Sequence, residues 1–162
     1  MALVPSNVFL RRMTGSEFEK YLSTAIPGFA QEKMRAEKMS AAEAEQVSIE
    51  SYKNLLPKGV ESPDQFLFTI VEAQSNQGIG MIWFAKKISA ARKQAFVYDF
   101  EIEESFRGRG YGKEALLLIE TEARALGLDS MGLHVFGHNK DAYALYKKSG
   151  YQETNIVMAK NL

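Results

Sequence analysis

The sequence predicts an α/β fold in which a mixed sheet of about seven strands is flanked by four helices. Three observations point to this class. Two amphipathic helical segments occupy residues 14–56, and three β-favouring runs joined by short turns follow over 66–103. A succession of strand, glycine-rich loop, helix and strand begins after Ser105. Short turns imply antiparallel pairing, whereas a helical crossover implies parallel pairing, so the sheet must be mixed.

Composition limits what the protein can be. The chain has 162 residues, of which 46% are hydrophobic, and this suits a single globular domain. Its 20 basic and 20 acidic residues balance, which argues against a coat for nucleic acid or an anionic membrane. The absence of cysteine excludes thiolate metal sites and a cysteine nucleophile. The longest uncharged stretch, 73–85, is too short for the ~20 residues of a membrane span. With no signal-peptide layout at the start, a cytoplasmic protein is expected.

Two capping boxes mark the starts of the N-terminal helices. In each, a hydroxyl residue is followed three positions later by a glutamate, and apolar residues then recur at helical spacing. The pairs are Thr14 with Glu17 and Ser40 with Glu43. We expect a first strand at 8–13 before them, a break or kink at Pro27, and an end to the second helix before Pro57.

The middle of the chain predicts an antiparallel meander with strands at 66–71, 79–88 and 95–103. The third strand alternates almost cleanly between apolar and acidic residues. Its alternation predicts that one face carries Phe96, Tyr98, Phe100 and Ile102, and that the other carries Asp99, Glu101 and Glu103. The remaining elements are expected to be a helix at 110–126, a strand at 130–136, a helix at 139–148 and a final strand at 151–158.

The glycine-rich loop is the most informative stretch. It reads Arg107-Gly108-Arg109-Gly110-Tyr111-Gly112-Lys113. Alternate glycines allow close approach of the main chain to a ligand, and N–H groups at a helix N-terminus favour an anion such as a diphosphate. A Walker loop is excluded because Glu114 stands where its hydroxyl residue belongs. A dinucleotide-binding loop is excluded because the glycine spacing differs and the loop follows a meander.

Two motifs together resemble those of a known family. The pattern Arg107-x-x-Gly110-x-Gly112 after a strand is similar to the acyl-CoA signature of the GNAT superfamily of N-acetyltransferases. The downstream pattern N-x-x-A-x-x-x-Y-x-x-x-G-[FY] is similar to the second motif of that family. It is formed by Asn139, Ala142, Tyr146, Gly150 and Tyr151.

The resemblance implies a single GNAT domain over 1–162 that binds acetyl-CoA. In it, residues 14–56 form the substrate-side helices, 94–126 the acyl-CoA motif and 130–151 the second motif. A gap between the strands at 96–103 and 130–136 would admit the thioester. The implied cofactor-binding residues are Ile102, Glu103, Arg107, Gly108, Arg109, Gly110, Tyr111, Gly112, Lys113, Asn139, Ala142 and Tyr146.

The catalytic residues expected are Tyr146, Glu101 and Asp99. Tyr146 would protonate the departing thiolate, and an N–H near Ile102 would polarise the acetyl carbonyl. A carboxyl group beside an apolar cleft is suited to deprotonating an amine, but the choice among Glu101, Asp99, His134 and a water chain stays open. No metal site is expected, since the two histidines lack a ligand spacing.

The expected function is direct transfer of acetyl from acetyl-CoA to a primary amine of a small molecule, peptide or protein. The alternative is a non-catalytic, acyl-CoA-binding regulatory module. The expected partners are acetyl-CoA and the amine, with no nucleic acid and no membrane, and a homodimer is left open. Mild acidity over 14–61 leans toward a cationic acceptor such as a polyamine, an aminoglycoside or a lysine-bearing peptide.

Overall fold

The computed structural model describes residues 5–162 and contains a five-stranded sheet in the order β1-β2-β3-β4-β5. The first four strands pair antiparallel, and β5 pairs parallel to β4. The strands are β1 (Val8–Arg12), β2 (Gln65–Glu72), β3 (Gly78–Ser89), β4 (Arg92–Ile102) and β5 (Ser130–Leu133). The helices are α1 (Gly15–Ala36), α2 (Ala41–Leu55), α3 (Tyr111–Ala125) and α4 (Lys140–Lys148). The predicted α/β class and the four helices are confirmed.

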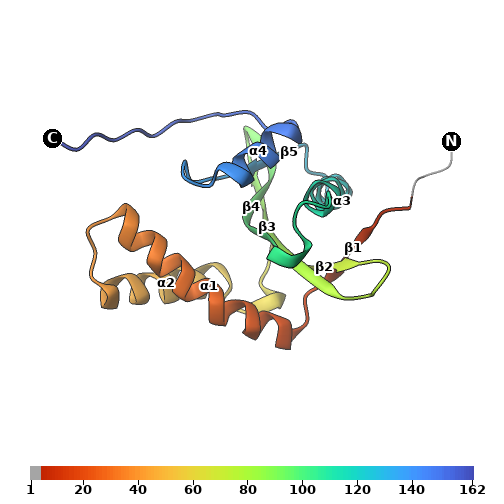
Figure 1. The fold of residues 1–162 in the computed structure, drawn as a ribbon, viewed down its shortest axis with the longest axis horizontal. Coiled ribbons are helices and arrows are strands. Elements are labelled where there is room, and N and C mark those ends of the chain that lie inside the picture. The colour runs from red at the N-terminus through yellow and green to blue at the C-terminus, as the bar shows by residue number, and fades with distance from the viewer. Residues whose placement is uncertain (1–4) are drawn as a thin grey trace.

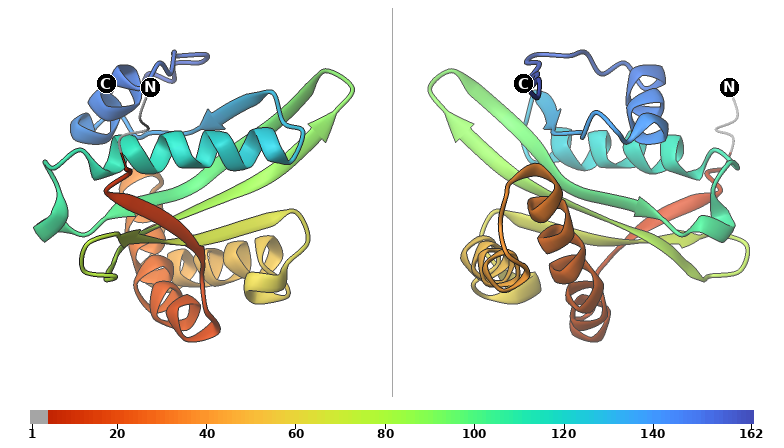
Figure 2. Two further views of the ribbon diagram at one scale, coloured as in Figure 1. Left: turned by 90° about the vertical axis from the view of Figure 1, so that its right-hand side faces the viewer. Right: turned by 60° about the vertical axis from the view of Figure 1, so that its left-hand side comes forward.

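The sheet separates two helical layers (Figure 1). One face is covered by α3 and α4, and the larger core on this side includes Phe84, Leu116 and Ile119. The other face is covered by α1 and α2, and the smaller core there includes Leu67 and Trp83. The β3–β4 hairpin projects beyond both layers (Figure 2). Side chains from each helical layer can therefore contact the face of the sheet that the layer covers.

Both N-terminal helices begin at the predicted capping boxes. The sequence predicts a break or a kink at Pro27, and a break does not occur, because α1 continues through Pro27. The buried Ser48 of α2 donates a hydrogen bond of 2.7 Å to the carbonyl of Ile26, next to the proline. This bond joins the two helices at the position where proline weakens the backbone ladder.

A β-bulge interrupts β4 and changes which face its side chains occupy. Trp83 pairs with Asp99, but the next residue of β3, Phe84, pairs with Val97, so Tyr98 is an extra residue. Tyr98 therefore packs on the α1–α2 side, whereas Phe100 packs on the α3 side. The prediction that Phe96, Tyr98, Phe100 and Ile102 share one face is wrong, because alternation along a strand fails at a bulge.

The parallel pairing of β4 with β5 stops early. The last pair joins Val97 to Leu133, although β4 continues for five more residues to Ile102. The separation of these strands expected from the sequence is thus present. It leaves the outer edge of β4, residues 98–102, without a neighbouring strand.

The expectation of about seven strands is wrong, since the described residues contain five. The strand expected at 151–158 does not form, and the one expected at 130–136 ends at Leu133. The C-terminal segment instead extends away from the molecule, with Ile156, Val157 and Met158 exposed (Figure 1). A β-favouring composition makes a strand only where a pairing partner is adjacent, and here the segment has none within the described residues.

Candidate active site

The N-terminus of α3 is open toward the loop at 103–110. Gly108 and Gly110 have φ angles of 75° and 85°, in the left-handed region that favours glycine. Gly110 is the N-cap of α3 and supplies no side chain to bond the first N–H groups of the helix. Those groups are consequently available to an anion, and the helix dipole favours negative charge at this end.

Gly112 is needed for a different reason. A Cβ atom there would lie 3.1 Å from Leu145 of α4 and 3.6 Å from Phe100 of β4. The glycine therefore lets the first turn of α3 pack closely against both elements and fixes the loop beside the open edge of β4.

The basic side chains of this loop make different contacts. Arg107 turns back to the strand: its Nε donates to the carbonyl of Ile102 at 2.7 Å, and an Nη lies 3.7 Å from a Glu101 carboxylate oxygen. Arg109 donates to the Ser105 carbonyl at 3.0 Å and stacks over Phe106. Lys113 is exposed. Arg107 and Arg109 thus stabilise the conformation of the loop, whereas the ammonium group of Lys113 is exposed to solvent.

Tyr111 also points away from the loop. Its hydroxyl donates to a Glu72 carboxylate oxygen at 2.6 Å, which ties α3 to β2. Of the residues expected to bind the cofactor, Tyr111 can therefore offer only its backbone N–H at this site.

The outer edge of β4 offers main-chain groups. The N–H of Glu103 donates to the carbonyl of Ile79 at 2.8 Å, so it faces β3. Because N–H groups alternate in direction along an antiparallel strand, the N–H of Ile102 faces the side that β5 has left. Ile102, rather than Glu103, presents its main chain to that edge.

Asp99 is a half-buried carboxylate beside this edge. One oxygen accepts a hydrogen bond of 2.6 Å from the hydroxyl of Tyr21, and the other accepts 2.9 Å from the N–H of Phe100. Burial raises the pKa of Asp99 above its ordinary value, and the two hydrogen bonds oppose that rise. An ionised carboxylate with a raised pKa is suited to accepting a proton near neutral pH.

The other two candidate bases are placed less favourably. Glu101 lies on the same face as Asp99, but its side chain is 64% exposed and its nearest cation is Arg107. His134 is exposed one residue past the end of β5, where its ring contacts Phe136 at 5.0 Å. Of the three, Asp99 combines burial with fixed hydrogen bonds.

Tyr146 reaches the site from α4. Its ring lies 6.5 Å from that of Phe100 and 5.6 Å from that of Tyr151. Burial, followed by the negative charge of Asp99, raises the pKa of Tyr146 to about 12. The hydroxyl therefore stays protonated at neutral pH and can act as a proton donor.

Asn139 begins α4. Its side-chain oxygen accepts a hydrogen bond of 3.3 Å from the N–H of Ala142, so it caps the helix. The side-chain amide nitrogen is left as a donor on the same end of α4. The second motif thus combines a helix cap at Asn139 with Tyr146 two turns later.

Tyr21 and Tyr52 were not anticipated from the sequence. They occupy α1 and α2, far from both motifs, and their rings contact each other edge to face at 6.4 Å. Both lie among the apolar residues that recur at helical spacing, and nothing in the local sequence distinguishes a Tyr that contacts a carboxylate from one that only packs. The long-range contact is visible once the layers are assembled.

A model of the acetyltransferase (GNAT) family matches residues 30–151, which is most of the chain and includes both motifs. The chain belongs to the GNAT family of acetyltransferases. Two Bacillus subtilis (strain 168) proteins, the uncharacterized N-acetyltransferases YycN and YdgE, are each 35% identical to it. The matches cover 96% of this chain and 99% of YycN, and 94% of this chain and 97% of YdgE.

Solved structures show the same fold. The crystal structure of YycN superposes with a TM-score of 0.86, over 96% of this chain and 98% of that one. AAC(6')-Iy, in complex with a bisubstrate analog of CoA and acetylneamine, gives a TM-score of 0.61 at 15% identity, over 97% and 99% of the two chains. The GNAT family uses acetyl-CoA, and the open helix end, the glycine loop and the free strand edge of this chain fit that ligand.

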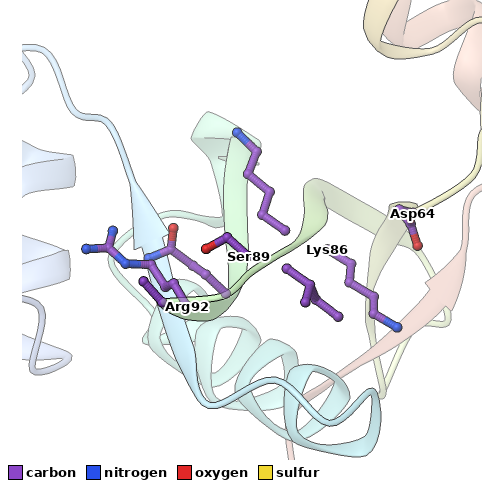
Figure 3. A pocket seen from close by; sticks show the side chains of 8 residues that line it. Asp64, Lys86, Ser89 and Arg92 are labelled. Atoms are coloured by element: carbon purple, nitrogen blue, oxygen red, sulfur yellow. The ribbon is translucent and has the colours of Figure 1, made fainter.

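A second basic cluster lies elsewhere. Lys86, Lys87 and Arg92 line a hollow of ≈ 740 Å³ at the β3–β4 hairpin, and Figure 3 shows Arg92 extending away from Lys86. Since β4 begins at Arg92 and ends at Ile102, this hollow is at the opposite end of the strand from the loop at 103–110. Among the described residues there is no group of three metal-ligating side chains, and no helix suited to crossing a membrane.

Proposed function

We propose that this protein transfers acetyl from acetyl-CoA directly to a primary amine. The observation that carries the proposal is the position of Asp99 and Tyr146 beside the part of β4 that β5 no longer pairs. A base and an acid thereby approach the same gap from opposite sides of the sheet.

The cofactor would occupy the loop and the free strand edge. The N–H groups at the start of α3 and the charge of Lys113 would hold its diphosphate. The side-chain amide of Asn139 would bond the pantetheine arm, and the carbonyl of Ile102 is already bonded by Arg107. Bound acetyl-CoA supplies an activated acetyl group, and the rest of the chemistry falls to the chain.

Asp99 would accept a proton from the ammonium of the acceptor, which has an ordinary pKa of about 10.4 and is almost fully protonated at neutral pH. The free amine can then form the new N–C bond while the C–S bond breaks. Tyr146 would give its proton to the departing sulfur and take the second proton from nitrogen. The proton on Asp99 returns to solvent, so one proton is released for each acetyl transferred.

The N–H of Ile102 would stabilise the charge that develops on the carbonyl oxygen. It faces the gap and is held in a paired strand, so it needs no reorganisation during the reaction. With no cysteine in the chain, an acyl-cysteine intermediate is excluded and direct transfer is the simplest route.

The acceptor is expected on the α1–α2 side, because the half-buried carboxylate of Asp99 lies on that face of β4 and contacts α1. Three glutamates of the acidic segment 14–61 make contacts of their own. Glu32 contacts Arg35 and His138, Glu37 contacts Lys33, and Glu43 caps α2. These contacts engage part of the acidic side chains, and the excess of acidic residues over 14–61 still favours a cationic acceptor.

The test is a thiol-release assay with acetyl-CoA and a panel of amines, run beside calorimetric titration of acetyl-CoA. Turnover should fall at least about a hundredfold in Asp99→Asn, because the base is lost, while acetyl-CoA affinity is retained. Glu101→Gln is the matched charge-neutralising control and should cost much less. Binding without release of CoA for any amine would instead support a regulatory module.

A further inference from the structure

One hydrogen bond connects the acceptor-side layer to the carboxylate of β4. Tyr21 of α1 donates to Asp99 at 2.6 Å across 78 residues of sequence. Among the described residues, the Asp99 carboxylate accepts two hydrogen bonds. One comes from the Tyr21 hydroxyl, and the other comes from the main-chain N–H of Phe100.

The ring of Tyr21 is held in a fixed position. It contacts the ring of Tyr52 at 6.4 Å, and Tyr52 in turn contacts Phe29 at 6.2 Å and Trp83 at 5.9 Å. Trp83 is buried in β3 and is the cross-strand partner of Asp99. The aromatic contacts therefore run from α1 through α2 to Trp83 of β3, whose backbone pairs with that of Asp99.

This path makes the hydroxyl of Tyr21 a permanent donor. Burial, and then the charge of Asp99, raises the pKa of Tyr21 far above its ordinary value, so it does not give up its proton to the carboxylate. A hydrogen bond donated to the ionised form stabilises that form against the cost of burial.

We propose that Tyr21 is a positioning residue that keeps Asp99 ionised and aimed at the gap between β4 and β5. Among residues 5–162, the groups that face Asp99 are Tyr21 from α1, Tyr52 from α2, the Phe100 N–H from β4 and Tyr146 from α4. None of them is a cation, so hydrogen bonding rather than ion pairing maintains the charge. The catalytic part of this inference rests on the proposed function.

The first test compares pH profiles of kcat/KM for wild type, Tyr21→Phe and Tyr98→Phe. Tyr21→Phe keeps the ring and its packing but removes the hydroxyl that donates to Asp99. The acidic limb of the kcat/KM profile, where Asp99 becomes protonated, should therefore move to higher pH. At a pH on that limb the variant should lose about tenfold, and on the plateau it should approach wild type. Tyr98→Phe removes a hydroxyl from the same aromatic cluster without touching Asp99 and should leave the limb in place. A limb that stays unmoved in Tyr21→Phe would overturn the proposal.

The second test needs no turnover and so separates this proposal from the proposed function. The chain contains four aspartates, at positions 64, 99, 129 and 141, so carboxyl carbon NMR of ¹³C-aspartate protein gives a resolvable spectrum. Asp99→Asn assigns the resonance. The Asp99 carboxyl should titrate at higher pH in Tyr21→Phe than in wild type, with no change in Tyr98→Phe. Equal titration in all three proteins would refute the role of Tyr21 even if the enzyme is active.

Discussion

The guanidinium of Arg107 donates to the carbonyl of Ile102 at 2.7 Å, so the first basic residue of the glycine loop binds the strand that precedes it. The loop is thereby fixed relative to the free edge of β4. The sequence alone could not tell which basic residues of the loop hold its shape and which offer charge to a ligand. This contact indicates that Arg107 holds the shape of the loop.

Arg107 and Lys113 should differ in how salt affects their loss. Arg107→Ala should weaken acetyl-CoA binding about tenfold at all ionic strengths, because it removes a charge-assisted hydrogen bond that shapes the site. Lys113→Ala should weaken binding mainly at low salt, because an exposed charge is screened. Titration calorimetry in low and high salt measures both. Equal salt dependence of the two variants would show that Arg107 also acts as a ligand charge.

Tyr146→Phe should lower kcat about tenfold to a hundredfold with little change in the KM for acetyl-CoA. Since the pKa of Tyr146 is raised to about 12, the loss should be the same from neutral pH to pH 10. Steady-state kinetics over that range provide the measurement. Unchanged turnover, together with weaker acetyl-CoA binding in Asn139→Ala, would remove Tyr146 from the mechanism.

Glu17 should make folding stability depend on pH in the acidic range. Hydrogen bonds, first from Arg11 and then from Thr14 and Thr69, lower the pKa of Glu17 to about 2. Its folded pKa lies below the unfolded value, so the stabilisation is complete above about pH 4.5 and is lost as pH falls toward 2. Glu17→Gln should cost about 1–2 kcal/mol at neutral pH, measured by urea unfolding. The two proteins should converge in stability near pH 2, and a constant difference would contradict this assignment.

Two glycine substitutions should have opposite effects. A Cβ at Gly80 would clash with the main-chain oxygen of Glu101, which cannot move without distorting the β3–β4 ladder, so Gly80→Ala should cost about 3 kcal/mol. A Cβ at Gly28 meets nothing within 4 Å, so Gly28→Ala should stabilise α1 by about 0.5–1 kcal/mol. Thermal unfolding of both variants tests the pair. A neutral Gly80→Ala would show that the strands can separate locally without cost.

Much of the fold could be read from local patterns. The capping boxes fixed the starts of α1 and α2, and alternation located the meander, because both signals depend on near neighbours in sequence. The motifs also located the loop and Asn139. Local signals could not reveal the bulge at Tyr98, since it depends on how β3 and β4 align.

The site was only partly predictable for the same reason. Sequence placed Asp99 and Glu101 together, but their different exposure depends on what α1 and α2 cover. The partnership of Tyr21 with Asp99 spans the sheet and two layers, and no periodicity encodes it. The strand expected at 151–158 is a further example. Its local sequence favours a strand, but no neighbouring strand lies beside it within the described residues.

The separation of the two layers has a consequence for how such a protein can change its substrate. The helices α3 and α4 lie on one face of the sheet, and α1 and α2 lie on the other (Figure 1). Under the proposed function, surface residues of the N-terminal helices can therefore change without altering the groups proposed to bind acetyl-CoA. Tyr21 limits that freedom. If Tyr21 positions Asp99 as proposed, an α1 helix altered to accommodate a new amine has to keep a hydroxyl at this position, or activity is lost toward acidic pH.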